Sequence, residues 1–390
     1  MLRMNKVNVL FFADMLIADY DGAAKTMYQL INRIPVDRFE FMFVCGIGPD
    51  SIAGYQCIRV MSLSVPGNKN YRFATTMFQK AEIDKAIDLF DPDIIHIATP
   101  SLLGNYALKT AKRRGLPVIS IYHTHFVSYI DYYAKNFPFL IDFTKDRVNH
   151  ILKTFYNQCD IVYVPSNTMI QELASTGIKH EVMRLWERGI DKDVFMPSKR
   201  DSSFMQSITG NENPCILFAS RLVWEKNLQT MINLYWLTEK KQLNYNFIIA
   251  GDGIAGGLLK KQMPKAFFIG YVSHELLATV YASSDVFFFP SITETFGNVV
   301  LEAMASGLPC VIADCGGSKD FITHGENGFK CNPIDAQDFL THISEIIERP
   351  ELAKRFAEAG IKTAKKYVWE NLAWEYFEDL QSLALKTIVI

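Results

Sequence analysis

The sequence lacks an excess of charge of either sign. Lysine and arginine together number 40 and aspartate and glutamate 42, so the formal net charge is −2. Because proteins that bind nucleic acid through its phosphates usually carry a basic excess, we expect no nucleic-acid partner. Charged residues make up 21% of the chain and hydrophobic residues 49%, a composition that is typical of globular proteins and not of disordered chains.

Long apolar runs and paired cysteines are also missing. No apolar run approaches the roughly 18 to 20 residues that a helix needs to cross a bilayer. The apolar stretch near the N-terminus is interrupted by Asp14 and precedes no small-residue cleavage site, so we interpret it as a first strand. The seven cysteines include no C-x-x-C pair, which argues against a disulfide framework and a zinc site. We therefore expect a cytoplasmic protein without a bound metal.

What the sequence does contain is an alternation of short strands and longer helices. A length of 390 residues favours two domains of roughly 150 to 200 residues each. β-rich runs separated by segments of helical period predict α/β domains with parallel sheets. The predicted strands are residues 7–12, 39–45, 94–97, 118–122 and 161–164 in the first half, and 215–219, 247–250, 267–269, 286–289 and 309–313 in the second.

The segment 188–203 is polar, contains Gly and Pro, and shows neither period, so we interpret it as the interdomain linker. The predicted domains are then 1–195 and 196–370, and 371–390 forms a last helix that could pack on either of them. Two doubly wound domains would face each other across a cleft. Because ligands of open parallel sheets bind beyond the carboxyl ends of the strands, we expect the chemistry in loops that directly follow strands in both halves.

The most informative loop, SITETFGNVVLEAMASG, follows the predicted strand 286–289. Its first carboxylate, Glu294, lies in the loop, and Glu302 lies about one turn into a helix. Between them, Phe296, Gly297 and Asn298 bring backbone N–H groups to the helix N-terminus, where the helix dipole favours an anion such as a phosphate. Taken singly, either glutamate would be read as an ordinary surface residue.

A second constellation follows the strand 215–219, where Arg221 and Lys226 lie on a strand-to-helix turn. Arginine can bind two oxygens of a diphosphate at once, and lysine supplies a point charge. Both cations would stabilise the negative charge that develops on a leaving nucleotide, which is the work of a metal ion in other enzymes. The alternative is a solvated pair of surface charges.

These residues carry a family resemblance. The E-x7-E spacing, followed by GGSKDFITHGENGF, closely resembles glycosyltransferase family 4 over residues 215–331 and more weakly over the first half. The resemblance implies the GT-B architecture, with an acceptor-binding first Rossmann-like domain, a donor-binding second one, and a last helix that crosses back to the first domain. It also implies that Glu294 holds hydroxyls of the donor sugar and that Glu302 binds the ribose of the nucleotide.

The cation pair matches the R-x4-K pattern of the same family, which implies binding of the donor diphosphate without a metal. Asn227 stands where many relatives have Gly, and we interpret this as a tolerated change. We expect Glu225, beside Lys226, to face solvent. A further departure follows the Gly-Gly turn, where Ser318 and Lys319 replace the proline that is usual in the family.

Other candidate residues also follow predicted strands. His123 lies at the end of the strand 118–122, where a lone histidine is more often structural; the resemblance implies that it contacts the donor sugar, and His125 is left unassigned. For Gly22, after the first strand, the resemblance implies a glycine that lets the diphosphate and the acceptor pass close to the backbone. The candidates in the second half are Gly251, Asp252, Gly253, Gly270 and Tyr271, which border the base and ribose or form plain turns.

The segment 126–155 is rich in aromatic side chains with interleaved lysine and arginine. Amphipathic basic segments can lie on anionic membranes, so peripheral contact with the inner face of a membrane is one interpretation. The other is an apolar core face with a solvated basic edge.

The resulting hypothesis is a retaining, metal-independent hexosyltransferase of mannosyltransferase-like type, which uses GDP-mannose or a UDP-hexose and a lipid or glycan acceptor in the synthesis of cell-envelope glycans or glycolipids. The nucleotide-diphosphate sugar serves as a co-substrate, and no cofactor is expected. A nucleotide-sugar epimerase or an NAD enzyme is one alternative, although the G-x-G-x-x-G of the NAD enzymes is absent after the first strand. A relative that binds the sugar nucleotide without catalysis is another.

Overall fold

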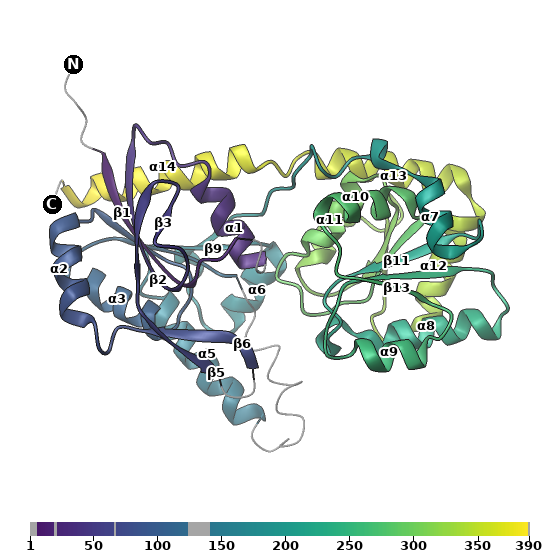
Figure 1. The fold of residues 1–390 in the computed structure, drawn as a ribbon, viewed down its shortest axis with the longest axis horizontal. Helices are drawn as coiled ribbons and strands as arrows, with labels where there is room; N and C mark the ends of the chain where they lie inside the picture. The colour runs from purple at the N-terminus through teal and green to yellow at the C-terminus, as the bar shows by residue number, and fades with distance from the viewer. Residues whose placement is uncertain (1–5, 19–21, 66–67, 124–140, 389–390) are drawn as a thin grey trace. The chain divides into compact units, whose positions relative to one another are not determined.

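The computed structural model describes residues 6–18, 22–65, 68–123 and 141–388, which form two compact units (Figure 1). Unit 1 contains the described residues up to 123, residues 141–187 and the chain from Trp369 onward. Unit 2 contains residues 188–368. The chain therefore leaves unit 1 at the start of the polar segment 188–203 and returns to it at the last helix.

Unit 1 is built on a sheet of eight strands in the order β10-β9-β8-β7-β1-β2-β4-β3. All neighbours are parallel except β3 and β4. The strands are β1 (Val7–Met15), β2 (Phe39–Ile47), β3 (Ser51–Ile52), β4 (Tyr55–Arg59), β7 (Ile94–Ile97), β8 (Val118–Ile121), β9 (Ile161–Val164) and β10 (Met183–Leu185). A separate antiparallel pair consists of β5 (Met61–Val65) and β6 (Asn68–Thr75).

Helices cover both faces of this sheet, because successive side chains of a strand point to opposite faces and both sets are apolar. In β1, Phe11 belongs to the core on one face and Phe12 to the core on the other. The first face packs against α1 and α14, and the second against α2, α3, α5 and α6. These helices are α1 (Gly22–Ile31), α2 (Lys80–Phe90), α3 (Leu102–Arg114), α5 (Ile141–Tyr156), α6 (Asn167–Ser175) and α14 (Trp369–Ile388).

The last helix is held on unit 1 by polar contacts inside an apolar interface. The indole Nε1 of Trp186 donates to the Leu372 carbonyl at 3.0 Å, and the Tyr376 hydroxyl lies 2.9 Å from His96 Nδ1. Tyr376 and Leu380 are buried in the same core as β1. Residues 369–388 are therefore an integral part of the first unit.

Unit 2 contains a six-stranded, all-parallel sheet in the order β13-β12-β11-β14-β15-β16. Its strands are β11 (Cys215–Ala219), β12 (Asn246–Ala250), β13 (Phe267–Gly270), β14 (Val286–Phe289), β15 (Cys310–Ala313) and β16 (Phe329–Cys331). Its helices are α7 (Ser202–Thr209), α8 (Leu228–Lys240), α9 (Gly256–Gln262), α10 (His274–Ser283), α11 (Asn298–Ala305), α12 (Ala336–Glu348) and α13 (Pro350–Ala364).

The strand order of unit 2 reverses at its centre. From β11 the chain moves outward through β12 to β13, then returns to place β14 on the other side of β11. Such a reversal is the point in an open parallel sheet where loops diverge and ligands bind. None of the helices in the described ranges combines the length and apolar character that crossing a membrane requires.

Candidate active site

The candidate site of unit 2 lies where the strand order reverses. β11 and β14 are parallel neighbours, with Ile216 paired to Val286 and Leu217 to Phe287. Because parallel neighbours end at the same edge of the sheet, the loop after β11 and the loop after β14 emerge side by side. The first carries Arg221 and Lys226, and the second carries Glu294. Segments about 70 residues apart in the chain thus form one site.

At this edge Lys226 and Glu294 form a buried ion pair. Lys226 Nζ lies 2.5 Å from Glu294 Oε1, and the two side chains are 8% and 16% exposed. The same carboxylate oxygen accepts a hydrogen bond from Ser291 Oγ at 2.9 Å. Burial alone would raise the pKa of Glu294, but the charge of Lys226 and the hydrogen bonds from Lys226 and Ser291 lower it below the usual range. Glu294 is therefore held ionised and oriented.

Arg221 contributes to the same field from an exposed position. Its positive charge also lowers the pKa of Glu294, so it lies near this carboxylate. The site therefore contains two cations, Lys226 and Arg221, near the Glu294 carboxylate. The structure brings these three predicted residues together.

The turn that carries Lys226 is fixed by its neighbours. Asn227 has φ +55°, a left-handed conformation that Gly and Asn tolerate best, which explains why Asn can replace the Gly of many relatives. Its Nδ2 donates to the carbonyls of Pro290, at 3.1 Å, and Pro333, at 2.7 Å. Our expectation for Glu225 was wrong: it is buried, 5% exposed, because the turn packs under the Glu294 loop, where Thr293 Oγ1 donates to the Glu225 carbonyl.

The start of α11 packs closely against the turn that carries Ser318. Gly297 has φ +95°, and a Cβ at this position would lie 2.6 Å from Ser318 Cβ, so only glycine fits. Asn298 Oδ1 and Ser318 Oγ are buried and have no hydrogen-bond partner among the described residues. Such groups are rare in folded proteins, and an ordered water or a polar ligand can complete their hydrogen bonding. Phe296 packs its ring on Phe321, at 4.8 Å between centroids, so only its backbone can contact a ligand.

Glu302 and the Gly-Gly turn at Gly316 and Gly317 make different contacts near the Glu294 loop. Glu302, in α11, accepts a hydrogen bond from the Tyr281 hydroxyl at 3.2 Å. Gly317 N donates to the Glu294 carbonyl at 2.6 Å, and a Cβ on Gly316 would lie 3.0 Å from Glu294 N. The Gly-Gly turn thus supports the backbone of Glu294. This close approach explains why glycine is needed at Gly316, a reason that the sequence pattern did not reveal.

The glycines after β12 shape the neighbouring loop. A Cβ on Gly251 would lie 2.0 Å from the Ser220 carbonyl oxygen, and one on Gly253 would lie 2.4 Å from that of Leu222. These glycines let the loop after β12 pack directly against the loop that carries Arg221. Asp252 Oδ2 accepts a hydrogen bond from Tyr271 N at 2.9 Å, which links this loop to the turn at Gly270.

Two predicted residues belong to unit 1. His123 lies two residues after the end of β8 and is buried, 7% exposed. Gly22 is the first residue of α1, and its carbonyl accepts a hydrogen bond from Thr26 Oγ1 at 2.8 Å. His125 lies outside the described residues, as does the first part of the segment 126–155.

The described part of that segment lies in α5, which carries apolar side chains on both its buried and its exposed face. Leu152 and Phe155 are buried in the core of unit 1. Phe143 and Ile151 are 67% and 48% exposed. The core interpretation therefore holds for one face of α5, and the other face presents apolar side chains to the surface.

Comparison with known proteins identifies two family domains in the chain. Residues 20–194 match the family described as Glycosyltransferase Family 4, and residues 199–363 match Glycosyl transferases group 1. The division between the two matches falls inside the polar segment 188–203. Together the two matches cover both units of the fold.

Several curated relatives are similar over most of this chain. A GDP-mannose-dependent alpha-mannosyltransferase of Corynebacterium glutamicum is 26% identical over 95% of this chain and 88% of its own length. The sulfoquinovosyl transferase of Arabidopsis thaliana is 33% identical over 76% of this chain, which spans 58% of that relative. An alpha-monoglucosyldiacylglycerol synthase of Streptococcus pneumoniae is 30% identical over 66% of this chain and 59% of its own length.

The solved structure of sucrose-phosphate synthase from Thermosynechococcus elongatus has the same fold. It superposes with a TM-score of 0.77 over 97% of this chain and 99% of its own, at 18% sequence identity. Both units, each a parallel sheet between layers of helices, thus have counterparts in a GT-B structure. Because the Glycosyltransferase Family 4 and Glycosyl transferases group 1 domains together span both units, the chain belongs to the glycosyltransferases that these two families describe.

Proposed function

We propose that this chain is a retaining hexosyltransferase that moves a sugar from GDP-mannose or a UDP-hexose to a lipid or glycan acceptor and needs no metal ion. The observation that carries the proposal is the buried pair of Lys226 and Glu294 at the carboxyl edge of the sheet. Burying two opposite charges is unfavourable unless they are well paired, so such a pair at a ligand-binding edge is a candidate for function.

The groups that Lys226 and Glu294 use to bind each other are also the groups that a donor sugar nucleotide needs. Lys226, with Arg221, supplies positive charge for the diphosphate, and Glu294 accepts hydrogen bonds from sugar hydroxyls. The start of α11, with the buried Asn298 Oδ1 and Ser318 Oγ, adds polar groups next to the same position. Binding of the donor would thus replace the ion pair with two complementary contacts, while Glu302 takes the ribose.

In the proposed reaction the cations stabilise the charge on the departing nucleoside diphosphate, so a metal ion is not required. The acceptor hydroxyl attacks the anomeric carbon from the face that the diphosphate leaves, and the diphosphate takes the hydroxyl proton. His123 would contact the sugar near the reacting carbon. A covalent intermediate needs carboxyl groups on both sides of the bond, whereas Glu294 and Glu302 both follow β14.

The choice of substrates is supported by the names of the relatives. One is described as dependent on GDP-mannose, and another as a synthase of a glucosylated diacylglycerol. Mannose and glucose are both hexoses, and a glucosylated diacylglycerol is a glycolipid. We therefore propose a hexose donor, with a glycan or diacylglycerol-type lipid as the acceptor.

Incubation of the chelator-treated protein with GDP- and UDP-hexoses and with diacylglycerol or glycan acceptors tests this function. We expect a glycosylated product whose anomeric configuration, read by NMR, equals that of the donor. Loss of turnover on chelation that Mg²⁺ or Mn²⁺ restores would refute metal independence, and an inverted product would refute retention. Donor binding without transfer or hydrolysis would indicate a non-catalytic relative, and conversion of the free sugar nucleotide would indicate an epimerase.

For a lipid acceptor, we further propose that the exposed face of α5 contacts the anionic inner face of a membrane. Phe143 and Ile151 would enter the interface, and the exposed Arg147 and Lys153 would meet lipid phosphates. Flotation with vesicles that contain phosphatidylglycerol should recover the protein, and Phe143→Ser with Ile151→Ser should reduce that recovery. Equal recovery of both proteins would refute the assignment of α5.

A further inference from the structure

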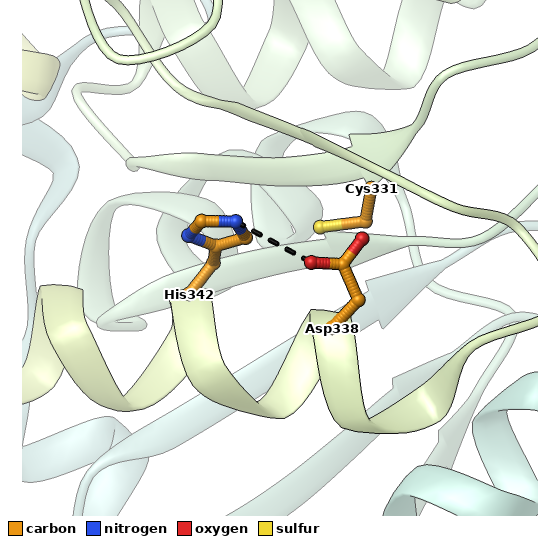
Figure 2. A group of neighbouring side chains, drawn as sticks. All are labelled: Cys331, Asp338 and His342. Atoms are coloured by element: carbon orange, nitrogen blue, oxygen red, sulfur yellow. Dashed lines mark ion pairs between the residues drawn. The ribbon is translucent and has the colours of Figure 1, made fainter.

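A cluster of metal-ligating side chains lies in unit 2, between the end of β16 and the first turns of α12. Cys331 is the last residue of β16, and Asp338 and His342 are one helical turn apart on α12. Figure 2 shows the thiol of Cys331 and the imidazole of His342 directed toward the carboxylate of Asp338. One ligand atom from each of the three residues lies within 4.8 Å of the other two.

The chemistry of this set suits a zinc-type ion. Thiolate sulfur, imidazole nitrogen and carboxylate oxygen are the three ligand types that zinc binds in proteins, at about 2.0 to 2.3 Å. Around a tetrahedral ion, such ligand atoms lie about 3.3 to 3.8 Å apart. His342 Nε2 and Asp338 Oδ1 are already 3.5 Å apart. Small side-chain rotations could therefore bring the three atoms onto one ion.

The contacts behind the ligands resemble those of known metal sites. A ligating histidine usually presents its second nitrogen to a carboxylate, and a ligating carboxylate is itself hydrogen-bonded. His342 Nδ1 lies 3.7 Å from Glu345 Oε2, and the other oxygen of this carboxylate, Oε1, pairs with Arg349 Nη1 at 2.6 Å. Asp338 uses only Oδ2 to accept the backbone N–H of Asn332, at 2.8 Å, which leaves Oδ1 for a metal.

A purely structural account explains part of this cluster. Asp338 supports the start of α12, its spacing from His342 gives an ordinary helix ion pair, and a buried cysteine can act as a small apolar residue. That account leaves His342 Nδ1 buried without a hydrogen bond from any described residue. It also gives no reason for the thiol to lie within 4.8 Å of both the carboxylate and the imidazole.

We propose that Cys331, Asp338 and His342 bind one divalent transition-metal ion of the zinc class, with a fourth position left for water or a small ligand. The ion would join the end of β16 to α12 on either side of the turn at Pro333. The Pro333 carbonyl accepts hydrogen bonds from Asn227 Nδ2 and from Thr230 Oγ1 at 2.8 Å. The site thus stabilises a turn that touches the loop of Lys226 without taking part in the transfer reaction.

Titration of the untagged, full-length, chelator-treated protein with Co²⁺ tests this site, because cobalt reports a thiolate ligand by a charge-transfer band in the near ultraviolet. We expect one equivalent of Co²⁺ with that band, its displacement by Zn²⁺, and a higher Tm in the presence of Zn²⁺. Cys331→Ser should abolish the band. His342→Gln and Asp338→Asn should weaken binding at least tenfold, and Glu345→Gln about tenfold.

Two control variants keep the test specific. Cys315→Ser removes a cysteine outside the cluster, and His180→Gln removes an exposed histidine, so both should bind Co²⁺ as the unaltered protein does. Asp338→Asn keeps an oxygen for Asn332 N–H and so tests the ligand without removing the support of α12. The absence of the band in the unaltered protein, or an unchanged affinity for Co²⁺ in His342→Gln, would overturn the proposal. Neither result bears on glycosyl transfer, because activity is not the readout.

Discussion

Glu294 Oε1 accepts hydrogen bonds from both Lys226 Nζ, at 2.5 Å, and Ser291 Oγ, at 2.9 Å, so a carboxylate that follows β14 is fixed by a cation that follows β11. Glu302, in contrast, accepts a hydrogen bond from the hydroxyl of Tyr281, a neutral group on α10. The two carboxylates of the E-x7-E pattern therefore have different surroundings, and we expect their loss to have different effects.

Replacement of Glu294 by Gln should lower kcat strongly, since the proposed task of this carboxylate is to position the sugar, and a misplacement of about 1 Å can slow a reaction on the order of a hundredfold. The affinity for free nucleoside diphosphate should stay within a few fold. Glu302→Gln should weaken nucleotide binding and affect kcat less, because a ribose contact is similar in the ground and transition states. Calorimetry with the nucleotide, alongside turnover, measures both effects. A Glu294→Gln enzyme with near-normal turnover would contradict the assignment of the sugar site.

Replacement of Arg221 or Lys226 by Ala should weaken the binding of nucleoside diphosphate and turnover together, because both cations meet the phosphates before and during the reaction. Nucleoside without phosphate should bind nearly unchanged. Lys226→Ala should also be less stable than Arg221→Ala, since removing one partner of a buried ion pair leaves Glu294 without its partner, whereas Arg221 is exposed. Isothermal titration with nucleoside and nucleoside diphosphate is the measurement. Equal losses of affinity for the two ligands would place these residues away from the phosphates.

The sequence was sufficient to predict the central strands because they are apolar on both faces. All ten predicted strands are present, and runs such as 286–289 coincide with their strands, since a strand buried on both sides reads as a continuous apolar run. The short strands β3, β4, β10 and β16 were not predicted, because two to five residues give too little pattern. The β5–β6 pair was missed for another reason: Leu63 and Phe73 are exposed, so burial does not produce an alternation there.

The candidate site could be predicted residue by residue but not as an arrangement. Spacing placed Lys226 and Glu294 after strands, yet only the strand order makes those strands neighbours, and a single sequence does not reveal that order. The hydrogen bond from Ser291 to Glu294 and the packing of Ser318 against Gly297 were not predicted, although Ser291 is the first residue of the loop SITETFGNVVLEAMASG. The cluster around Cys331 was missed because its ligands follow no cysteine spacing.

A buried histidine gives unit 1 a dependence on pH. His96, on β7, is fully buried, with its ring stacked on Phe11 at 3.9 Å and its Nδ1 2.9 Å from the Tyr376 hydroxyl of α14. Burial lowers the pKa of His96 to about 3, from an ordinary value of 6.5, because the charged ring would lose its hydration. In the unfolded chain the same ring takes up a proton below pH 6.5.

Because the folded pKa lies below the unfolded one, the contribution of His96 to stability is complete above about pH 6.5 and is lost as the pH falls from there toward 3. The loss amounts to at most about 1.4 kcal/mol for each pH unit in this window. Hydrogen exchange of β7 and α14 amides, corrected for intrinsic rates, should therefore show weaker protection at pH 5 than at pH 7. His96→Gln should reduce this difference, whereas His180→Gln, at an exposed position, should leave it unchanged. If His96→Gln kept the full difference in protection, the acid sensitivity of unit 1 would have to come from its carboxylates and not from this ring.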